Sequence, residues 1–197
     1  MSGHFIAIEG LDGCGSTTQI RLLGERFPDW HRTAEPSQGP AGLLIREALR
    51  GDNPLPDSVL PYLFAADRKD HLEREIEPAL ARNVRVVTDR YYASSMAYQA
   101  LISPLDRIVT LNQDFRSPDL TLFLDISPEQ ALERIVARGQ AIERFETLEH
   151  LREIAAGFGV ALALLAERGE QIEVIDATGT QEEVHARIIE TLERCLP

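Results

Sequence analysis

A glycine-rich turn near the start of the chain constrains the fold more than any other feature. The apolar run at residues 5–8 leads into the loop Gly10-Leu11-Asp12-Gly13-Cys14-Gly15-Ser16-Thr17-Thr18. Gly10, Gly15 and Thr17 satisfy the phosphate-binding pattern G-x-x-x-x-G-K-[ST], but Ser16 stands at the lysine position. The loop predicts that the chain binds a nucleoside polyphosphate, and the missing lysine leaves open whether it also transfers a phosphoryl group.

The residues on either side of this loop favour a strand before it and a helix after it. A short continuous apolar run is typical of a strand that is buried on both faces of a parallel sheet. A strand, a glycine turn and a helix start together direct backbone N–H groups and the positive helix end at an anion. Thr17 lies where a hydroxyl group would coordinate Mg²⁺. The alternative is a tight turn that holds no ligand.

Composition limits the class of protein and its partners. The chain has 197 residues and a net charge of −12, which is compatible with one domain and disfavours nucleic acid or an anionic membrane as the main partner. Cys14 and Cys195 lack metal-ligand spacing, so a reducing cytosol is expected. The first residues are not typical of a signal peptide, so none is expected, and no apolar stretch is long enough to span a bilayer. The most apolar stretch, residues 158–166, predicts a buried helix segment.

Apolar runs typical of strands alternate with helical patterns along the whole chain. The predicted strands cover residues 5–8, 32–33, 84–88, 120–126 and 172–175. This alternation predicts an α/β fold with a parallel sheet and helices on both faces. Helix starts are expected at Asp57-Ser58, at Ser127-Pro128-Glu129 and at the capping box that begins with Thr180.

Polar residues follow most of the predicted strands, at the edge where ligands gather in sheets of this kind. Glu35-Pro36 follows the second strand, and Asp89-Arg90 follows the third. An arginine at this place could bind an acceptor phosphate with two hydrogen bonds, and the aspartate could organise Mg²⁺. A simple ion pair at the strand end explains Asp89 and Arg90 equally well.

Segments along nearly the full length of the chain resemble the thymidylate kinase family. The segments that carry the resemblance are residues 5–13, Leu63-Phe64-Ala65-Ala66-Asp67-Arg68, Asp89-Arg90-Tyr91 with Ser94-Ser95 and Ala97-Tyr98-Gln99, residues 118–125, and Glu143-Arg144-Phe145-Glu146. The second and third segments are the most specific. The resemblance implies a three-layer P-loop kinase fold with a five-stranded parallel sheet, formed by a single domain over residues 1–197.

The resemblance also implies roles for individual residues. Phe64 would stack on the thymine ring, and Arg68 would hydrogen-bond the base edge. Tyr98 would crowd the sugar 2′ position, and Ser95 stands where the family often has an amide that touches the base. From the residues alone, a core side chain is the preferred interpretation of Phe64, Tyr98 could be a buried tyrosine with a satisfied hydroxyl group, and Arg68 could be part of a solvated helix face. The residues implied for dTMP are Asp12, Phe64, Arg68, Arg90, Ser94, Ser95 and Tyr98.

A short lid is expected at about residues 138–147. Phosphoryl transfer depends on positioning and charge neutralisation, and a moving segment often supplies an arginine. One branch of the family carries this arginine in the phosphate loop and another carries it in the lid. Gly13 occupies the loop position here, so the chain is similar to the lid-arginine branch. The implied catalytic residues are Asp12, Arg90, Arg138 and Arg144, although a lid arginine could also be a solvated partner of Glu133 or Glu143.

Two positions depart from the family pattern. Ser16 replaces the lysine that normally contacts the β- and γ-phosphates, a loss expected to cost on the order of a few kcal/mol of transition-state stabilisation. Ala34 stands where the family usually has an arginine, which leaves Arg90 and Arg46 as donors to the acceptor phosphate.

Two hypotheses follow from these observations. The first is an Mg²⁺-dependent cytoplasmic enzyme, expected to be a homodimer, that transfers the ATP γ-phosphoryl group to dTMP. It would hold Mg²⁺ through Thr17 and Asp89. The second is a catalytically silent nucleotide-binding protein, which the loss of the lysine favours. A kinase that acts on another pyrimidine deoxynucleotide is a variant of the first hypothesis.

Overall fold

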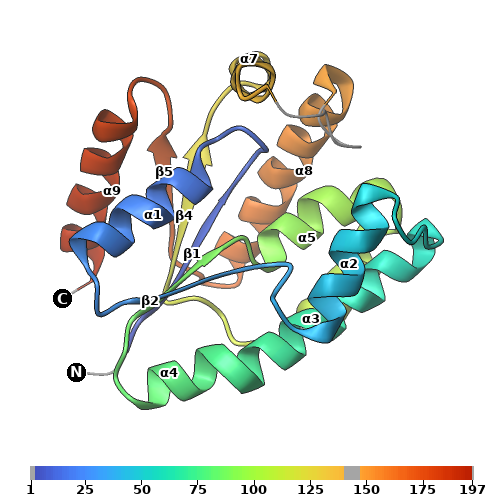
Figure 1. Cartoon of the computed structure of the whole chain (residues 1–197), viewed down its shortest axis with the longest axis horizontal. Helices are drawn as coiled ribbons and strands as arrows, with labels where there is room; N and C mark the ends of the chain where they lie inside the picture. Colours follow the sequence, from blue (N-terminus) through green and yellow to red (C-terminus); the bar gives the residue numbers. More distant parts are fainter. Residues whose placement is uncertain (1–2, 140–146, 197) are drawn as a thin grey trace.

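The computed structural model describes residues 3–139 and 147–196, which alternate between strands and helices (Figure 1). In chain order the elements are β1 (Phe5–Gly10), α1 (Ser16–Arg26), β2 (His31–Ala34), α2 (Pro40–Arg50), η1 (Asp57–Val59), α3 (Leu60–His71), the π-helical turn η2 (Leu72–Ile76), α4 (Glu77–Ala81), β3 (Val86–Asp89), α5 (Tyr92–Tyr98), η3 (Gln99–Leu101), α6 (Leu105–Asn112), β4 (Leu120–Asp125), α7 (Pro128–Ala137), α8 (Leu148–Glu167), β5 (Ile172–Asp176) and α9 (Gln181–Cys195).

The strands form one parallel sheet in the order β2-β3-β1-β4-β5. The centre of this sheet is β1, whose residues are all buried, as its apolar sequence predicts. The chain builds the β2–β3 side of β1 first and then crosses to the β4–β5 side. The carboxyl ends of β1, β3 and β4 therefore meet where the strand order reverses, which is where ligands bind in open α/β sheets. The predicted five-stranded parallel sheet is confirmed.

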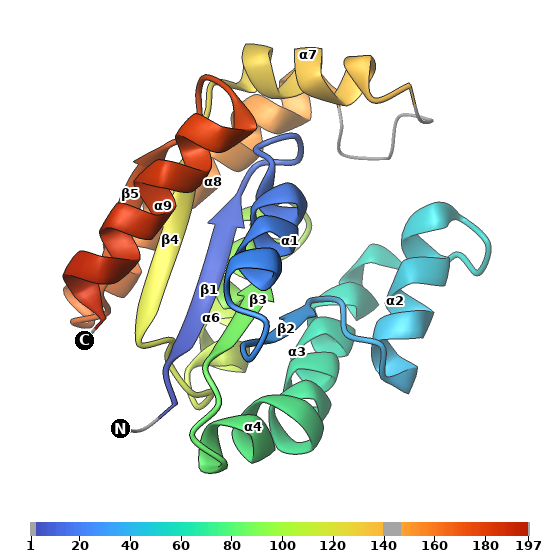
Figure 2. The ribbon, with the colours of Figure 1, turned by 60° about the vertical axis from the view of Figure 1, so that its left-hand side comes forward.

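Helices cover both faces of the sheet and give the molecule three layers (Figures 1 and 2). On one face α1 packs beside α9, and on the other α5 packs beside α8. The continuous run from α3 through η2 to α4 lies beyond the β2 end of the sheet, together with α2 (Figure 2). The α7 helix crosses above the carboxyl ends of the strands. This arrangement leaves the loop after β1 between the sheet and α7.

The most apolar stretch, residues 158–166, is helical as predicted, but only one side of it is buried. Phe158, Ala161 and Leu165 are buried, whereas Val160 is 49% exposed. Phe158 in α8 is fully buried, and its ring lies 5.1 Å from the ring of Phe123 in β4 and 6.0 Å from the ring of Tyr98 in α5. These aromatic contacts tie α8 to the sheet and to the helix that carries part of the site.

Local signals fix several element ends. The Ser127 hydroxyl accepts a hydrogen bond from the Gln130 N–H at the start of α7, and Thr180 forms a capping box with Glu183 at the start of α9. The third strand begins two residues later than predicted. The Val84 N–H donates to the Ala79 carbonyl and closes α4, so Val84 is not available to the sheet.

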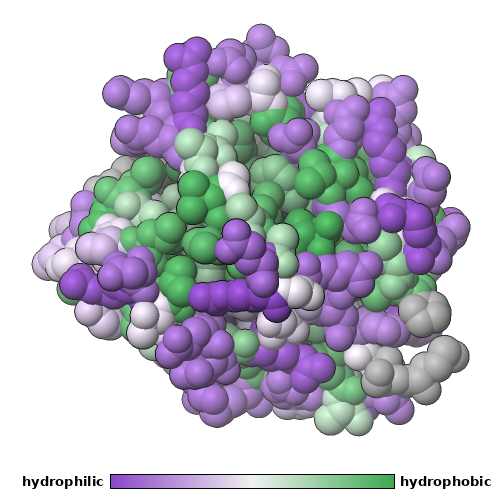
Figure 3. Space-filling view, turned by 180° about the vertical axis from the view of Figure 1, so that it is seen from behind, coloured by the Kyte–Doolittle hydropathy of each residue, from purple (hydrophilic) through white to green (hydrophobic). Residues whose placement is uncertain are grey.

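One face of the molecule carries a group of hydrophobic side chains (Figure 3). Viewed from behind, hydrophobic side chains gather near the centre and hydrophilic side chains surround them (Figure 3). Within residues 3–139 and 147–196, no helix is both long enough and apolar enough to cross a membrane.

The capping box of α9 provides a test of local stability. Thr180→Ala removes the side-chain acceptor of the Glu183 N–H, and we expect it to lower the free energy of unfolding by about 1 kcal/mol in chemical denaturation. Thr110→Ala is the matched control, because that hydroxyl only donates to the Asp106 carbonyl within α6. Equal losses in the two variants would contradict a capping role for Thr180.

Candidate functional site

The loop between β1 and α1 has a backbone that only glycine adopts easily. Gly13 has φ +83°, and a Cβ atom there would lie 2.5 Å from the Ala131 carbonyl oxygen of α7. Gly15 has φ +98° and stands as the N-cap of α1. The loop thus brings the chain close beneath α7 and turns it into a helix. Its N–H groups and the positive end of α1 face the space above the sheet.

Ser16 and Thr17 form the first turn of α1, and β3 ends beside them. The Thr17 hydroxyl donates to Asp89 Oδ2 over 2.7 Å. The other carboxylate oxygen, Asp89 Oδ1, is buried and has no hydrogen-bond partner in the part of the chain that the structure describes. A hydroxyl group and an unsatisfied carboxylate oxygen side by side form a donor set that suits a hard cation such as Mg²⁺.

A cavity of about 930 Å³ opens above this loop. Eight of the nine predicted loop residues line it, Leu11 through Thr18, while Gly10 lies outside its wall. Asp89, Arg90 and Arg138 also line it. So does Arg134 of α7, whose guanidinium donates to the carbonyls of Cys14 and Ala177 over 3.3 and 2.8 Å. Burial raises the pKa of the Cys14 thiol to about 11, so this side chain stays protonated and acts as a small space-filler.

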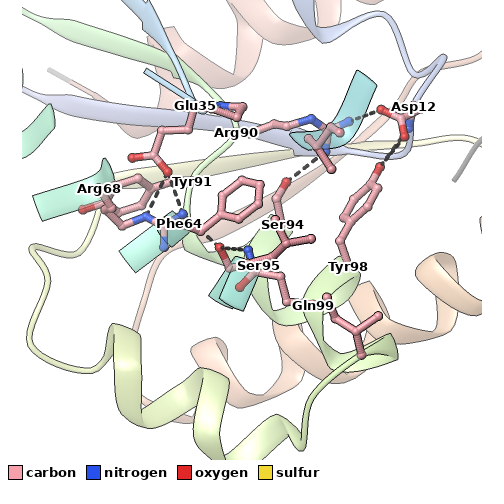
Figure 4. Close-up of a pocket in the computed structure, with 14 residues that line it drawn as sticks. Asp12, Glu35, Phe64, Arg68, Arg90, Tyr91, Ser94, Ser95, Tyr98 and Gln99 are labelled. Carbon is pink, nitrogen blue, oxygen red and sulfur yellow. Dashed lines mark hydrogen bonds and ion pairs between the residues drawn. The ribbon is translucent and has the colours of Figure 1, made fainter. Parts of the chain in front are cut away.

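A second cavity of about 210 Å³ adjoins the first. All seven residues predicted for dTMP line it: Asp12, Phe64, Arg68, Arg90, Ser94, Ser95 and Tyr98 (Figure 4). They come from the phosphate loop, α3, α5 and the end of β3, which are distant in sequence. Asp12 and Arg90 line both cavities, so these two residues mark the place where the cavities meet.

Arg90 is held from several sides at this junction. Its guanidinium donates to Asp12 Oδ1 over 2.6 Å, to the Ser94 hydroxyl over 2.9 Å and to the Gly10 carbonyl over 3.1 Å. It also lies 4.9 Å from the centre of the Tyr98 ring. Burial tends to lower the pKa of Arg90, but Tyr98, Asp12 and other neighbours raise it well above its ordinary value. The guanidinium therefore stays charged.

The backbone of Arg90 adopts an uncommon conformation to reach this position. Its φ is +69°, in the left-handed region that residues other than glycine seldom occupy. The Arg90 N–H donates to the Ile8 carbonyl of β1, and its own carbonyl accepts from the Thr88 hydroxyl. The sheet therefore fixes both sides of the strained residue.

Arg68 lies at the end of the second cavity that is farther from Arg90. It is almost fully buried, so it is not part of a solvated helix face. Its Nε and Nη2 donate to Glu35, Nη2 also donates to the Ser95 hydroxyl, and Nη1 donates to the Asn112 amide oxygen. A guanidinium has five N–H groups, so these contacts leave one N–H for a ligand. The buried pair with Glu35 holds Arg68 in one orientation.

Ser95 is oriented by the donors around it. Its oxygen accepts from Arg68 over 3.0 Å and from the Gln99 side-chain amide over 3.2 Å. These two bonds occupy both acceptor sites of the hydroxyl group, so its proton is left to donate. Arg68 and Ser95 therefore both present donors at this end of the cavity, and such an arrangement favours a carbonyl oxygen on the ligand.

Some predictions from the sequence were incomplete. Arg46 was expected as a donor to the acceptor phosphate; its terminal nitrogens donate to the carbonyls of Pro36 and Ser37, and Arg46 lines neither cavity. Arg138 lies at the end of α7 and is exposed, whereas Arg144 lies outside the described residues. The sequence did not indicate Asn112 or the buried role of Glu35. Only the position of Glu35 after β2 could have drawn attention to it.

The buried Glu35–Arg68 pair provides a stability test. Glu35→Ala leaves the Arg68 charge buried without its counter-ion, and we expect a loss of about 3–5 kcal/mol in the free energy of unfolding. The control is Glu129→Ala, which breaks an exposed pair with Arg152 and should cost less than about 1 kcal/mol. A small loss of unfolding free energy in both variants, measured by urea denaturation, would contradict a stabilising role for the Glu35–Arg68 pair.

Comparisons with known proteins agree with this geometry. The sequence model of one family, described as thymidylate kinase, matches residues 8–188. Probable thymidylate kinases from Pyrobaculum aerophilum and Pyrobaculum calidifontis are 43% and 41% identical to the chain, with 96% or more of each sequence covered. A thymidylate kinase from Synechococcus sp. is 38% identical, over 98% of this chain and 96% of its own.

A solved structure shows the same arrangement. The thymidylate kinase from Candida albicans superposes with a TM-score of 0.83 and 25% identity, over 98% of this chain and 92% of its own. The matches extend over the phosphate loop, both cavities and the full sheet. The chain therefore belongs to the thymidylate kinase family.

Proposed function

We propose that the protein transfers the γ-phosphoryl group of ATP to dTMP and releases ADP and dTDP. The main support for this proposal is that the two cavities share a wall, since Asp12 and Arg90 line both cavities. A donor nucleotide above the phosphate loop and an acceptor nucleotide in the smaller cavity would place their phosphates on either side of this junction. In-line transfer needs such an arrangement, since this chemistry depends mainly on positioning and charge.

The smaller cavity suits a thymine deoxynucleotide. Phe64 would stack on the base, and the donors of Arg68 and Ser95 would converge on a carbonyl oxygen of its edge. A cytosine amino group would face the same donors unfavourably, which disfavours dCMP as the acceptor. Tyr98 would lie beside the sugar, because its hydroxyl donates to Asp12 near the junction. Arg90 would bind the acceptor phosphate.

Mg²⁺ fits the larger cavity. Thr17 and Asp89 would hold the ion, and the unsatisfied Asp89 Oδ1 is the observation that supports this assignment. Among the described residues, no group of three or more His, Cys, Asp or Glu could hold a metal. That agrees with an ion bound through few protein groups together with phosphates. When bound, Mg²⁺ would neutralise charge on the phosphate oxygens.

Other groups would replace the charge of the missing lysine. The N–H groups at the start of α1 and the helix dipole would face the β- and γ-phosphates. Arg138 at the end of α7 and Arg144 would supply guanidinium charge from the lid. Ser16 still favours a second candidate, a silent nucleotide-binding protein, because it removes the ammonium group that family members use.

The assembly state and location are also proposals. We propose a homodimer, because family resemblance supports it and the hydrophobic face in Figure 3 offers a surface for a second copy. We propose a cytoplasmic location on the basis of the same resemblance. Analytical ultracentrifugation would measure the mass in solution.

An assay of ADP release distinguishes the kinase from the silent protein. With dTMP, ATP and Mg²⁺ we expect a kcat of ~1–100 s⁻¹, and with dCMP a much lower kcat/KM. Ser16→Lys in the same assay measures how far the serine lowers kcat relative to a loop that has the lysine. Tight binding of dTMP without ADP above background would support the silent protein and would overturn the proposed reaction.

Phe64 and Arg90 should affect different kinetic constants. Phe64→Ala removes a stacking surface used equally in the ground state and the transition state, so we expect KM for dTMP to rise about tenfold with little change in kcat. Arg90→Ala should lower kcat itself, because charge at the junction acts on the transition state. Tyr62→Ala is the control, since this residue lies on the same helix as Phe64 but is exposed and away from the cavity wall. Identical effects of the Phe64 and Arg90 variants would contradict these roles.

A further inference from the structure

A buried carboxyl group lies beneath the junction and has no part in the reaction described above. Glu9 is the fifth residue of β1 and is only 1% exposed. Its Oε1 accepts from the backbone N–H groups of Tyr91 and Ser94, and its Oε2 accepts from the Ser94 hydroxyl. The side chain thereby ties the central strand to the first turn of α5.

Ser94 connects this carboxyl group to the arginine at the junction. The Ser94 hydroxyl donates its proton to Glu9, which leaves its oxygen to accept from Arg90 Nη1 over 2.9 Å. The other terminal nitrogen of Arg90 donates to Asp12. Glu9 and Asp12 therefore hold the two ends of the same guanidinium, one through a hydroxyl group and one directly.

Glu9 has one charged neighbour and several neutral hydrogen-bond donors. Arg90 is the charged group that acts on the Glu9 carboxyl from the end of β3. The other groups are neutral: the Tyr91 N–H before α5, and the N–H and hydroxyl of Ser94 within α5. Asp12, Asp89 and the Tyr98 hydroxyl surround Arg90 on its other sides. Burial raises the pKa of Glu9 to about 7, although Arg90 and these hydrogen bonds lower it in part. Near neutral pH, both protonation states of Glu9 are populated.

We propose that Glu9 is a positioning residue for Arg90 and that binding of the acceptor phosphate is coupled to proton uptake by Glu9. The inference rests on the proposed function only in placing a nucleotide phosphate beside Arg90. A phosphate dianion there adds negative charge near the buried carboxylate and shares the cation that stabilises it. The ionised form of Glu9 then becomes less favourable, so its pKa rises and the group takes up a proton.

The proton balance is simple. One proton moves from the solvent to a Glu9 carboxylate oxygen when the phosphate binds, and it returns to the solvent when the nucleotide leaves. No covalent bond to the nucleotide forms or breaks in this step. With Glu9 neutral, the charge of Arg90 is directed to the phosphate and to Asp12.

Calorimetry in two buffers with different ionisation enthalpies measures this proton directly. At pH 7.5 the phosphate of dTMP, like other phosphate monoesters with a second pKa near 6, is already a dianion and releases almost no proton itself. We expect the wild-type protein to take up a measurable fraction of a proton per bound dTMP, since the ionised form of Glu9 is populated near neutral pH. Thymidine has no phosphate group, so its binding should take up none.

Variants separate positioning from a purely structural role. Glu9→Gln keeps the size of the side chain but cannot titrate, and we expect it to abolish the proton uptake on dTMP binding. Ser94→Ala keeps Glu9 but removes the bridge to Arg90, so affinity for dTMP should fall several-fold, and by a larger factor than affinity for thymidine. A residue that only stabilises the fold would change neither the proton count nor the ratio of the two affinities.

The possible outcomes separate the inference from the proposed function. Failure of the wild-type protein to bind dTMP would overturn the proposed function and this inference together. Binding of dTMP with no proton uptake, or with the same uptake in wild type and Glu9→Gln, would overturn the inference and leave the proposed function intact. If Glu9→Gln does not fold, the comparison of dTMP with thymidine in the wild-type protein still tests the inference, because equal proton uptake with both ligands would overturn it.

Discussion

The charged contacts of Arg90 are the interaction on which the site depends. The side chain reaches the junction from a backbone in the left-handed conformation, which hydrogen bonds to Ile8 of β1 and to Thr88 hold in place. Asp12 comes from the phosphate loop and Ser94 comes from α5, so the guanidinium joins the walls of both cavities. Removal of this cation would leave an acidic loop, an acidic strand end and a buried carboxyl group close together. Arg90 therefore stabilises the local structure by neutralising these carboxylates, in addition to its proposed role in binding phosphate.

The electrostatics of the whole chain make this local arrangement necessary. A net charge of −12 repels anionic nucleotides at a distance, and lysine is almost absent from the sequence. Attraction must then come from short-range groups that solvent does not screen. The structure supplies them as fixed guanidinium groups and backbone N–H groups rather than as flexible ammonium groups. Arg68 and Arg90 are both held by carboxylates, which lowers the cost of ordering them when a ligand arrives.

Much of the fold and part of the site could be predicted from local patterns. The loop from Gly10 to Thr18, the strand runs and the capping signals each lie within a few residues of sequence, so their spacing reveals them. The hydrogen-bond partners of Arg68 cannot be found in this way. Glu35 and Asn112 are 33 and 44 residues away, and nothing in their local sequence indicates that a buried guanidinium needs them. The same holds for Glu9, whose partners Tyr91 and Ser94, at the start of α5, are more than 80 residues away. Arg46 is the opposite case, because a basic residue of suitable type lies outside both cavities and donates to backbone carbonyls.

The close approach of Gly13 to α7 has a consequence for how this chain could change. Any side chain at position 13 would begin 2.5 Å from the Ala131 carbonyl oxygen and would start from a φ of +83°. An arginine introduced there by mutation would have to push the helix away before it could reach a nucleotide. An arginine at position 13 therefore requires an accompanying shift of α7, and the single substitution is expected to cost stability.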